Sequence, residues 1–166
     1  MDLPEFTIAE AQAAFERGEW TSASLTESYL RRVSAIDSSG PMLRSMIEIN
    51  PDAMTIADGL DAERRRGRTR GPLHGIPIVV KDSIDTADKM VTSAGSLALE
   101  HNVAPQDSFL MGKLRAAGVV RSWARRTSVR SASWPSSGPR SSIRFGLVRF
   151  RSSGTSNSSS YATASR

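Results

Sequence analysis

The stretch GPLHGIPIVVKDSIDT, residues 71–86, places a loop, a short apolar run and a charged pair next to one another. Residues 71–75 contain two glycines and a proline, which mark turns and loops. The apolar run 76–80 has the length of a buried strand and is too short for a core helix. It ends directly on Lys81 and Asp82, although lysine is almost never fully buried. A buried strand that runs into a lysine needs either a structural or a chemical explanation.

Capping signals divide the first 70 residues into helices. Thr7 and Glu10 fit a capping box, in which the hydroxyl and the carboxylate satisfy free backbone N–H groups. Ser24 and Glu27 fit a second box. A third helix is expected to start at Asn50, which would cap it, with Pro51 at the first helical position and the acid Asp52 in the first turn. The expected helices run from Thr7 to Gly18, from Ser24 to near Ser38 and from Asn50 to near Gly67.

The apolar pattern also predicts two further strands and, after strand 76–80, one more helix. The strands are residues 47–49 and a buried strand that begins at Val119, and the small, polar residues 92–96 form a loop near the strand ends. The order of helices, strand, loop, helix and strand predicts an α/β fold, with a sheet covered by helices. The last helix is capped by Asp107 or Ser108, carries Phe109, Leu110, Leu114 and Ala117, and ends at Gly118.

The residue inventory excludes several kinds of site. The chain has no cysteine, which rules out a disulfide framework, a thiolate metal site and a cysteine nucleophile. With only His74 and His101, we expect no metal site and no other cofactor. The acidic N-terminus does not resemble a signal peptide, and no run is long enough to span a membrane. We therefore expect a cytoplasmic protein without a membrane partner.

Charge divides the chain in two. Residues 1–120 carry 13 Lys and Arg against 17 Asp and Glu, a net charge of −4. Residues 121–166 carry nine Arg and no acid, a net charge of +9, and 15 of these 46 residues are serine. We therefore predict one domain segment over residues 1–120, followed by an Arg/Ser-rich tail over residues 121–166 that is disordered or translated out of frame.

Two explanations for Lys81 follow from the residues alone. In the structural one, Lys81 lies at the end of its strand, pairs with Asp82 or Asp85, and reaches water. In the chemical one, it lies in a dry pocket, where desolvation favours a neutral amine that can accept a proton. A lysine of this kind can serve as the base for a serine nucleophile.

Residues 71–86, together with the Thr-Ser-Ala-Gly-Ser loop at 92–96, resemble the amidase signature family around its catalytic lysine. Residues 50–53, 61–64 and 114–120 also resemble family segments, in the family's order. The resemblance covers residues 5–120. It implies the N-terminal fragment of the amidase signature fold, a mixed sheet flanked by helices.

The resemblance implies hydrolysis of a carboxylic amide C–N bond by a Ser-cisSer-Lys triad, in which Lys81 is the lysine. Asp82 and the 92–96 loop would support the site, His74 would pack in a loop, and His101 would lie at the surface. The triad serines are not identified in this chain. The SSG sequences at 136–138 and 152–154 lack the glycines and the apolar helix that the family has around its serines. We therefore expect the chain alone to be inactive.

Alternatives remain open at this stage. The resemblance implies a small-molecule amide substrate, but it also fits the glutaminase component of a tRNA-dependent amidotransferase. A different class is a non-enzymatic protein whose basic tail binds nucleic acid through phosphate contacts and aromatic stacking, which we do not favour. We also expect strand 76–80 to be left uncovered in this chain, which promotes aggregation. Nothing in the sequence indicates an oligomeric state.

A shifted reading frame would explain the tail. The codons CGG TCC TGG GCA AGA CGA ACT are compatible with residues 121–127. Read from the third base, they give Val-Leu-Gly-Lys-Thr-Asn, which resembles the family at this position. We hypothesise that the sequence from about residue 121 is an out-of-frame translation of an amidase gene.

Base-level sequencing of the gene across codons 115–130 tests this hypothesis. We expect that a one-base correction restores Gly-Lys-Thr-Asn and then two Gly/Ser-rich motifs. If no single-base shift restores the family sequence, the hypothesis is wrong and the basic tail is a genuine part of the protein.

Overall fold

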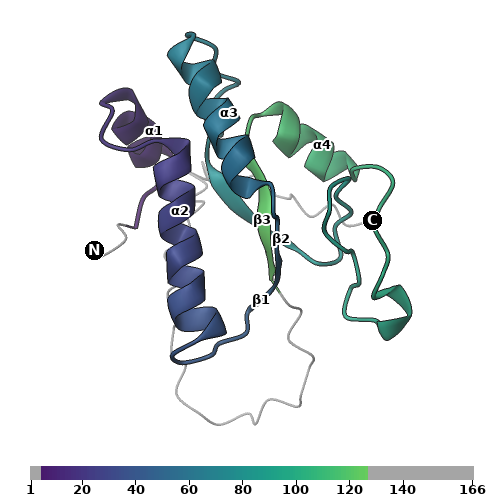
Figure 1. Ribbon diagram of the computed structural model, residues 1–166. Coiled ribbons are helices and arrows are strands. Elements are labelled where there is room, and N and C mark those ends of the chain that lie inside the picture. The colour runs from purple at the N-terminus through teal and green to yellow at the C-terminus, as the bar shows by residue number, and fades with distance from the viewer. Residues whose placement is uncertain (1–4, 127–166) are drawn as a thin grey trace, which may run out of the picture.

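A computed structural model describes residues 5–126 of the protein (Figure 1). This part holds four α-helices and three strands, which alternate from α2 onward, and α2 continues into a short π-helical turn. In chain order the elements are α1 (Ile8–Glu16), α2 (Ser22–Val33), η1 (Ser34–Ser38), β1 (Met46–Ile49), α3 (Ala53–Arg65), β2 (Pro77–Lys81), η2 (Leu97–Leu99), α4 (Phe109–Ala116) and β3 (Val120–Arg126).

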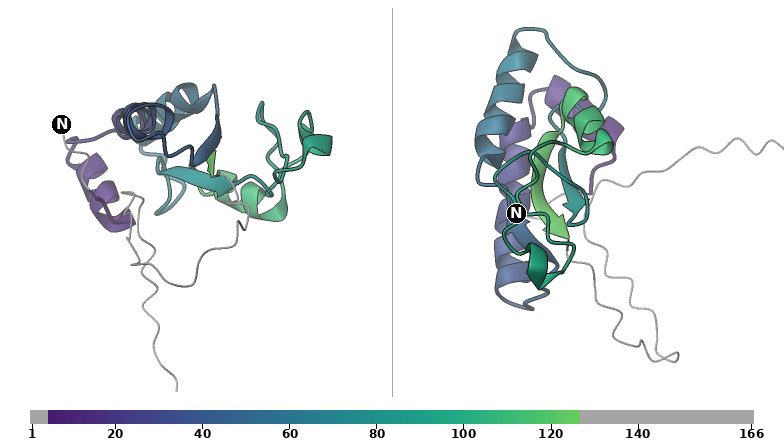
Figure 2. Two further views of the ribbon diagram at one scale, coloured as in Figure 1. Left: turned by 90° about the horizontal axis from the view of Figure 1, so that it is seen from below. Right: turned by 90° about the vertical axis from the view of Figure 1, so that its right-hand side faces the viewer.

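The strands form one mixed sheet in the order β1-β3-β2. β2 runs parallel to β3, and β1 runs antiparallel to it. The helices α2 and α3 cover one face of the sheet, and α4 lies beyond the opposite face (Figure 2). The expected α/β class, a mixed sheet flanked by helices, is therefore confirmed.

The main core lies between the sheet and the helices α1, α2 and α3. Both parallel strands contribute, because Ile76 just before β2 and Val120 at the start of β3 are fully or almost fully buried. We expected strand 76–80 to be left uncovered. This is wrong for the face of the sheet that points to α2 and α3, because these helices of the same chain cover it. The buried apolar members of the core are Ala11, Phe15, Leu25, Tyr29, Val33, Ala53, Ala57, Leu60, Ile76 and Val120.

The first helix follows the sequence prediction closely. Thr7 and Glu10 form the expected reciprocal box, with Glu10 Oε2 accepting from the Thr7 N–H at 2.7 Å. Ala11, Ala14 and Phe15 are the buried residues of α1. Gly18 follows the helix with φ of +71°, the left-handed conformation typical of a helix end.

The second helix starts three residues earlier than predicted. Its cap is Thr21 and not Ser24, and Ser24 takes the place that a glutamate usually holds in the box. The Asp61 side chain from α3 accepts from the N–H groups of Ser22 at 2.8 Å and Ala23 at 2.9 Å. The sequence prediction missed this start because one of the capping groups lies about forty positions further along the chain.

The third helix starts later than predicted, at Ala53. Asn50 does not cap the helix; its side-chain oxygen accepts from the Asp52 N–H at 2.9 Å and forms a local turn. The end is as expected, because Gly67 follows the last turn with φ of +71°. Arg64, in the last turn, joins α3 to α1, because it donates to Gln12 Oε1 at 2.8 Å.

The loop before β2 is held by a buried histidine and by a short backbone hydrogen bond. His74 is fully buried, its Nδ1 accepts from the Arg70 N–H at 3.3 Å, and its Nε2 lies 3.0 Å from the Leu60 carbonyl oxygen. This pattern places the ring proton on Nε2. Gly75 donates its N–H to the Gly118 carbonyl at 2.7 Å. The packing role predicted for His74 is confirmed.

β3 continues to Arg126, six residues beyond the boundary expected at residue 120. The sequence from residue 121 lacks apolar periodicity, but backbone pairing with β1 and β2 does not depend on it. The predicted tail otherwise falls on residues 127–166, which lie outside the described residues, and the domain boundary stays a prediction.

A matched pair of glycine substitutions tests the close packing at Gly75. Both Gly75 (φ +80°) and Gly67 (φ +71°) have left-handed backbone, but an added Cβ at Gly75 would lie 2.0 Å from Ser22 Oγ, whereas the space at Gly67 is open. We expect Gly67→Ala to cost about 1–2 kcal/mol of unfolding free energy from the backbone alone. Gly75→Ala should cost roughly 1–3 kcal/mol more, because of the collision with Ser22. Urea unfolding followed by circular dichroism measures both, and equal losses would contradict this packing.

Candidate active-site region

Lys81 is the last residue of β2, and it lies at the carboxyl end of the parallel pair β2–β3, in register with Arg126. This end of a parallel sheet is where α/β proteins commonly bind ligands. The Lys81 side chain is exposed. Exposure at the strand end agrees with the part of the structural explanation in which Lys81 reaches water, and the role of Lys81 stays a prediction. The described residues do not enclose it in a dry pocket.

Asp82, the next residue, is buried and holds the following loop in place. Its carboxylate accepts from Ser93 Oγ at 2.7 Å, from the Ser93 N–H at 3.2 Å and from the Gly95 N–H at 3.3 Å. The Asp82 backbone carbonyl accepts from the Ala94 N–H at 3.3 Å. This carboxylate therefore ties the end of β2 to the 92–96 loop.

The 92–96 loop has a shape that depends on these contacts. Ala94 has a φ of +50° and Gly95 a φ of +77°, and a left-handed alanine is uncommon. At the base of the loop, Thr92 and Asn102 exchange two hydrogen bonds, of 2.8 and 3.0 Å. The predicted loop near the strand end is therefore confirmed in its place, directly beside the residue that follows Lys81.

A second contact joins this region to the sheet's far edge. Glu48 in β1 accepts from the Val91 N–H at 2.8 Å, and Lys89 pairs with Asp52 at 2.8 Å. The segment after β2 therefore spans from Asp82 to the start of α3. The Lys89 pair is solvent-exposed and adds little, so the Glu48 hydrogen bond is the contact that holds the segment against β1.

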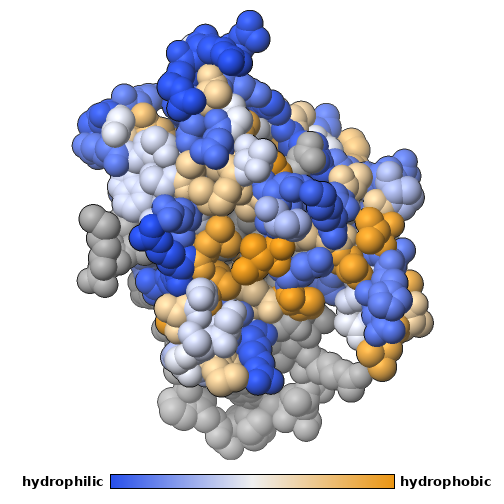
Figure 3. Space-filling model, in the orientation of Figure 1, coloured by the Kyte–Doolittle hydropathy of each residue, from blue (hydrophilic) through white to orange (hydrophobic). Residues whose placement is uncertain are grey.

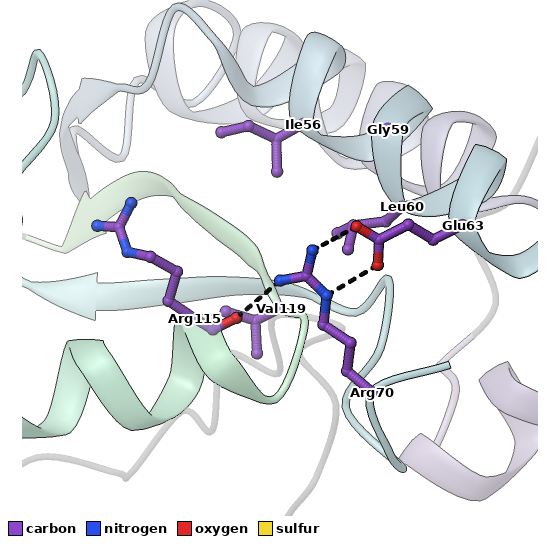
Figure 4. A pocket seen from close by; sticks show the side chains of 7 residues that line it. All are labelled: Ile56, Gly59, Leu60, Glu63, Arg70, Arg115 and Val119. Atoms are coloured by element: carbon purple, nitrogen blue, oxygen red, sulfur yellow. Dashed lines mark hydrogen bonds and ion pairs between the residues drawn. The ribbon is translucent and has the colours of Figure 1, made fainter. Parts of the chain in front are cut away.

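A cavity of about 180 Å³ lies at the opposite end of the sheet and not at Lys81. In Figure 4 it is bordered by α3, by the chain before β2 and by the end of α4. Arg70 forms two contacts with the Glu63 carboxylate and one with the Arg115 carbonyl, and its side chain crosses the opening. The Arg70 hydrogen bond holds the pKa of Glu63 below its usual value. Nothing that lines the cavity is a nucleophile, so we assign it no catalytic role.

The remaining candidates from the sequence are His101 and the two SSG sequences. His101 is exposed, as expected. The SSG sequences at 136–138 and 152–154 lie outside the described residues. Within residues 5–126 no group of three or more His, Asp or Glu side chains could hold a metal ion. No helix of that part is long and apolar enough to cross a membrane.

Comparison with known sequences gives a consistent assignment. A family model described as Amidase matches residues 24–125. A Schizosaccharomyces pombe protein named as an amidase is 43% identical over 118 residues, which are 71% of this chain and 20% of that protein. A glutamyl-tRNA(Gln) amidotransferase component of Chloroflexus aurantiacus is 39% identical over 120 residues, 72% of this chain and 24% of that component.

Comparison with solved structures agrees. The native peptide amidase from Stenotrophomonas maltophilia superposes with a TM-score of 0.67 at 48% identity, over 74% of this chain and 24% of that enzyme. An amidase family protein from Bacillus anthracis superposes with the same TM-score at 39% identity, over 70% of this chain and 23% of that protein. The chain thus spans about a fifth to a quarter of the length of the relatives it matches.

Removal of the Asp82 carboxylate should release the 92–96 loop. We expect Asp82→Ala to speed backbone hydrogen exchange at Ser93 and Gly95 by roughly tenfold or more, because the Ser93 N–H loses its acceptor, the Gly95 N–H loses one of two acceptors, and the turn opens locally. Asp85→Ala removes an equal charge from an exposed position three residues away and is the control.

Hydrogen exchange of chain 1–166, followed by mass spectrometry of the peptide that covers the loop, measures both variants. An unchanged exchange rate in Asp82→Ala, or an equal increase in Asp85→Ala, would show that Asp82 does not hold the loop.

Proposed function

Because the chain belongs to the amidase family, we propose that it supplies Lys81 as the proton-transferring lysine of a Ser-cisSer-Lys triad that hydrolyses a carboxylic amide. The observation that supports this most is the position of Lys81. It stands at the carboxyl end of β2, in the segment that the relatives share, and is followed by the buried Asp82 and its anchored loop.

The proposed chemistry needs a neutral lysine and two serines. The Lys81 amine takes a proton from the bridging serine, which takes one from the nucleophilic serine as this attacks the amide carbonyl. Backbone N–H groups stabilise the oxyanion. The leaving amine then receives the proton, and water hydrolyses the acyl-enzyme. Neither serine is assigned within the described residues, so the chain alone is expected to be inactive.

The proposed substrate class is a small-molecule amide. The 48% identity to a peptide amidase favours a free-standing hydrolase. Identities of 37–41% to several glutamyl-tRNA(Gln) amidotransferase components keep a glutaminase-type activity as the second candidate. Nucleic-acid binding by the basic tail concerns residues outside the described part, and it stays an alternative that we do not favour. A cytoplasmic location stays a prediction.

A chimera tests the role of Lys81. Residues 5–120 replace the equivalent residues of the S. maltophilia peptide amidase, and hydrolysis of a peptide amide is measured. We expect Lys81→Met, which keeps the length of the side chain and removes the amine, to lower kcat/KM by about 10³-fold or more, mainly through kcat.

Lys89→Met is the matched control, because Lys89 is also exposed and, among residues 5–126, its ion pair is a surface contact with Asp52. It should leave kcat/KM within about twofold of the unchanged chimera, as expected for a surface ion pair. A Lys81→Met chimera as active as Lys89→Met would refute the proposal, and so would an inactive chimera beside an active parent enzyme.

A further inference from the structure

The cavity at the end of the sheet away from Lys81 has the size and the walls of a small-molecule site. Its volume is about 180 Å³, and Ile56, Leu60 and Val119 give it apolar walls. An apolar cavity of about 150 Å³ in another protein binds one molecule of benzene. The cavity therefore has room for a ligand with one aromatic ring or a branched chain of similar size.

Arginine dominates the surroundings of this cavity. Residues 64–70 contain five arginines and no acid, and the end of α3 forms a hydrophilic region at the top of Figure 3. The lining itself carries Arg70 and Arg115 against Glu63. Arg115 is paired with Asp107, so Arg70 is the lining cation that faces a ligand. A positive environment of this kind favours an anionic ligand over a cationic one.

The Arg70 guanidinium has two N–H groups left for such an anion. Of its five N–H groups, Nε donates to the Glu63 carboxylate at 2.8 Å, Nη2 donates to the same carboxylate, and Nη1 makes a long contact of 3.4 Å with the Arg115 carbonyl. Among residues 5–126 this leaves one N–H on each Nη atom, on the side that the dashed lines of Figure 4 leave open. Two N–H groups arranged in this way match the two oxygens of a carboxylate. An anion can therefore bind Arg70 without displacing Glu63.

A glycine in α3 keeps part of this space open. Gly59 lies inside the helix and lines the cavity. A Cβ added at Gly59 would meet no atom within 4 Å. Because glycine is less favourable than alanine in a helix interior, α3 does not need it to form. A larger side chain at this position can fill the space without a clash at its Cβ.

We propose that this cavity binds a small carboxylate that carries one apolar ring or branched chain. The apolar part lies against Ile56, Leu60 and Val119, and the carboxylate accepts from the two remaining N–H groups of Arg70. Inorganic anions leave the apolar walls without a partner, and neutral apolar molecules leave the Arg70 N–H groups without one. The site is independent of the proposed role of Lys81, which lies at the other end of the sheet.

Benzoate is the first probe, titrated into isotope-labelled chain 1–166 while the backbone amide shifts are followed by NMR. We expect saturable shifts at Gly59, Arg70 and Val119, with a Kd of about 1 mM or below. Acetate lacks the ring and benzyl alcohol lacks the charge, so each should bind about tenfold more weakly or worse. Shifts that do not saturate, shifts that gather elsewhere on the chain, or equal affinity for all three compounds would overturn the proposal.

Two leucine substitutions test whether the ligand occupies the cavity. Gly112 in α4 also has no atom within 4 Å of an added Cβ, but it does not line the cavity. Both changes raise helix propensity, so both chains should fold at least as well as the original. Gly59→Leu should weaken benzoate binding by about tenfold or more, because its side chain takes up the space. Gly112→Leu should change the affinity by less than about twofold. Equal affinities of the two variants, in chains that thermal melts show to be folded, would contradict the site.

Two glutamine substitutions test the contact with the carboxylate. Arg17 donates twice to Glu19, at 2.7 and 2.8 Å, much as Arg70 does to Glu63, but it lies outside the cavity lining. Arg70→Gln should weaken benzoate binding by about tenfold or more and leave the weak binding of benzyl alcohol within about twofold. Arg17→Gln should change neither. Unchanged benzoate binding in Arg70→Gln, an equal loss in Arg17→Gln, or an equal loss of both compounds in Arg70→Gln would refute the carboxylate contact.

Discussion

The position of β2 depends on the close approach of the Gly75 backbone to its neighbours. Gly75 donates to Gly118 at 2.7 Å, and the next rung runs from the Val120 N–H to the Ile76 carbonyl at 3.0 Å. A side chain at Gly75 would collide with Ser22 at the start of α2. Because only a glycine can bring these segments together, the glycine turns fix where the parallel pair begins, and the strand length then places Lys81 at its carboxyl end.

Three buried carboxylates organise the segments around this sheet in the same way. Asp61 holds the start of α2, Asp82 holds the 92–96 loop, and Asp37 accepts from the N–H groups of Ser45 at 2.7 Å and Met46 at 3.1 Å at the start of β1. Burial tends to raise the pKa of Asp37, but the hydrogen bonds from Ser45 and Met46 outweigh it and lower the pKa. In segments whose backbone N–H groups have no helix or strand partner, a buried carboxylate can accept their hydrogen bonds in place of water.

The sequence predicted what local chemistry determines. The Thr7–Glu10 box, the helix end at Gly67 and the strand that leads to Lys81 depend on neighbours in the chain and were found. The start of α2 was misplaced because Asp61 completes it from another helix, and the open side of α4 was not foreseen because the apolar pattern does not show which residues have a partner. The sequence left open whether Lys81 is buried or reaches water, and in residues 5–126 it is exposed, because the environment of a strand end depends on elements that the local pattern does not reveal.

Lys81 therefore has a fixed position at the end of β2, but its side chain is exposed in the described part of the chain. β2 is an edge strand of the described sheet. Asp82 holds the loop that follows, and backbone hydrogen bonds at Asp85 and Ala87 hold the start of α4 nearby. The most direct test is a crystal structure of chain 1–166 bound to the remainder of the peptide amidase. The account predicts Lys81 Nζ out of contact with solvent and within about 3 Å of a serine hydroxyl. A solvated Lys81 with no serine in reach would contradict it.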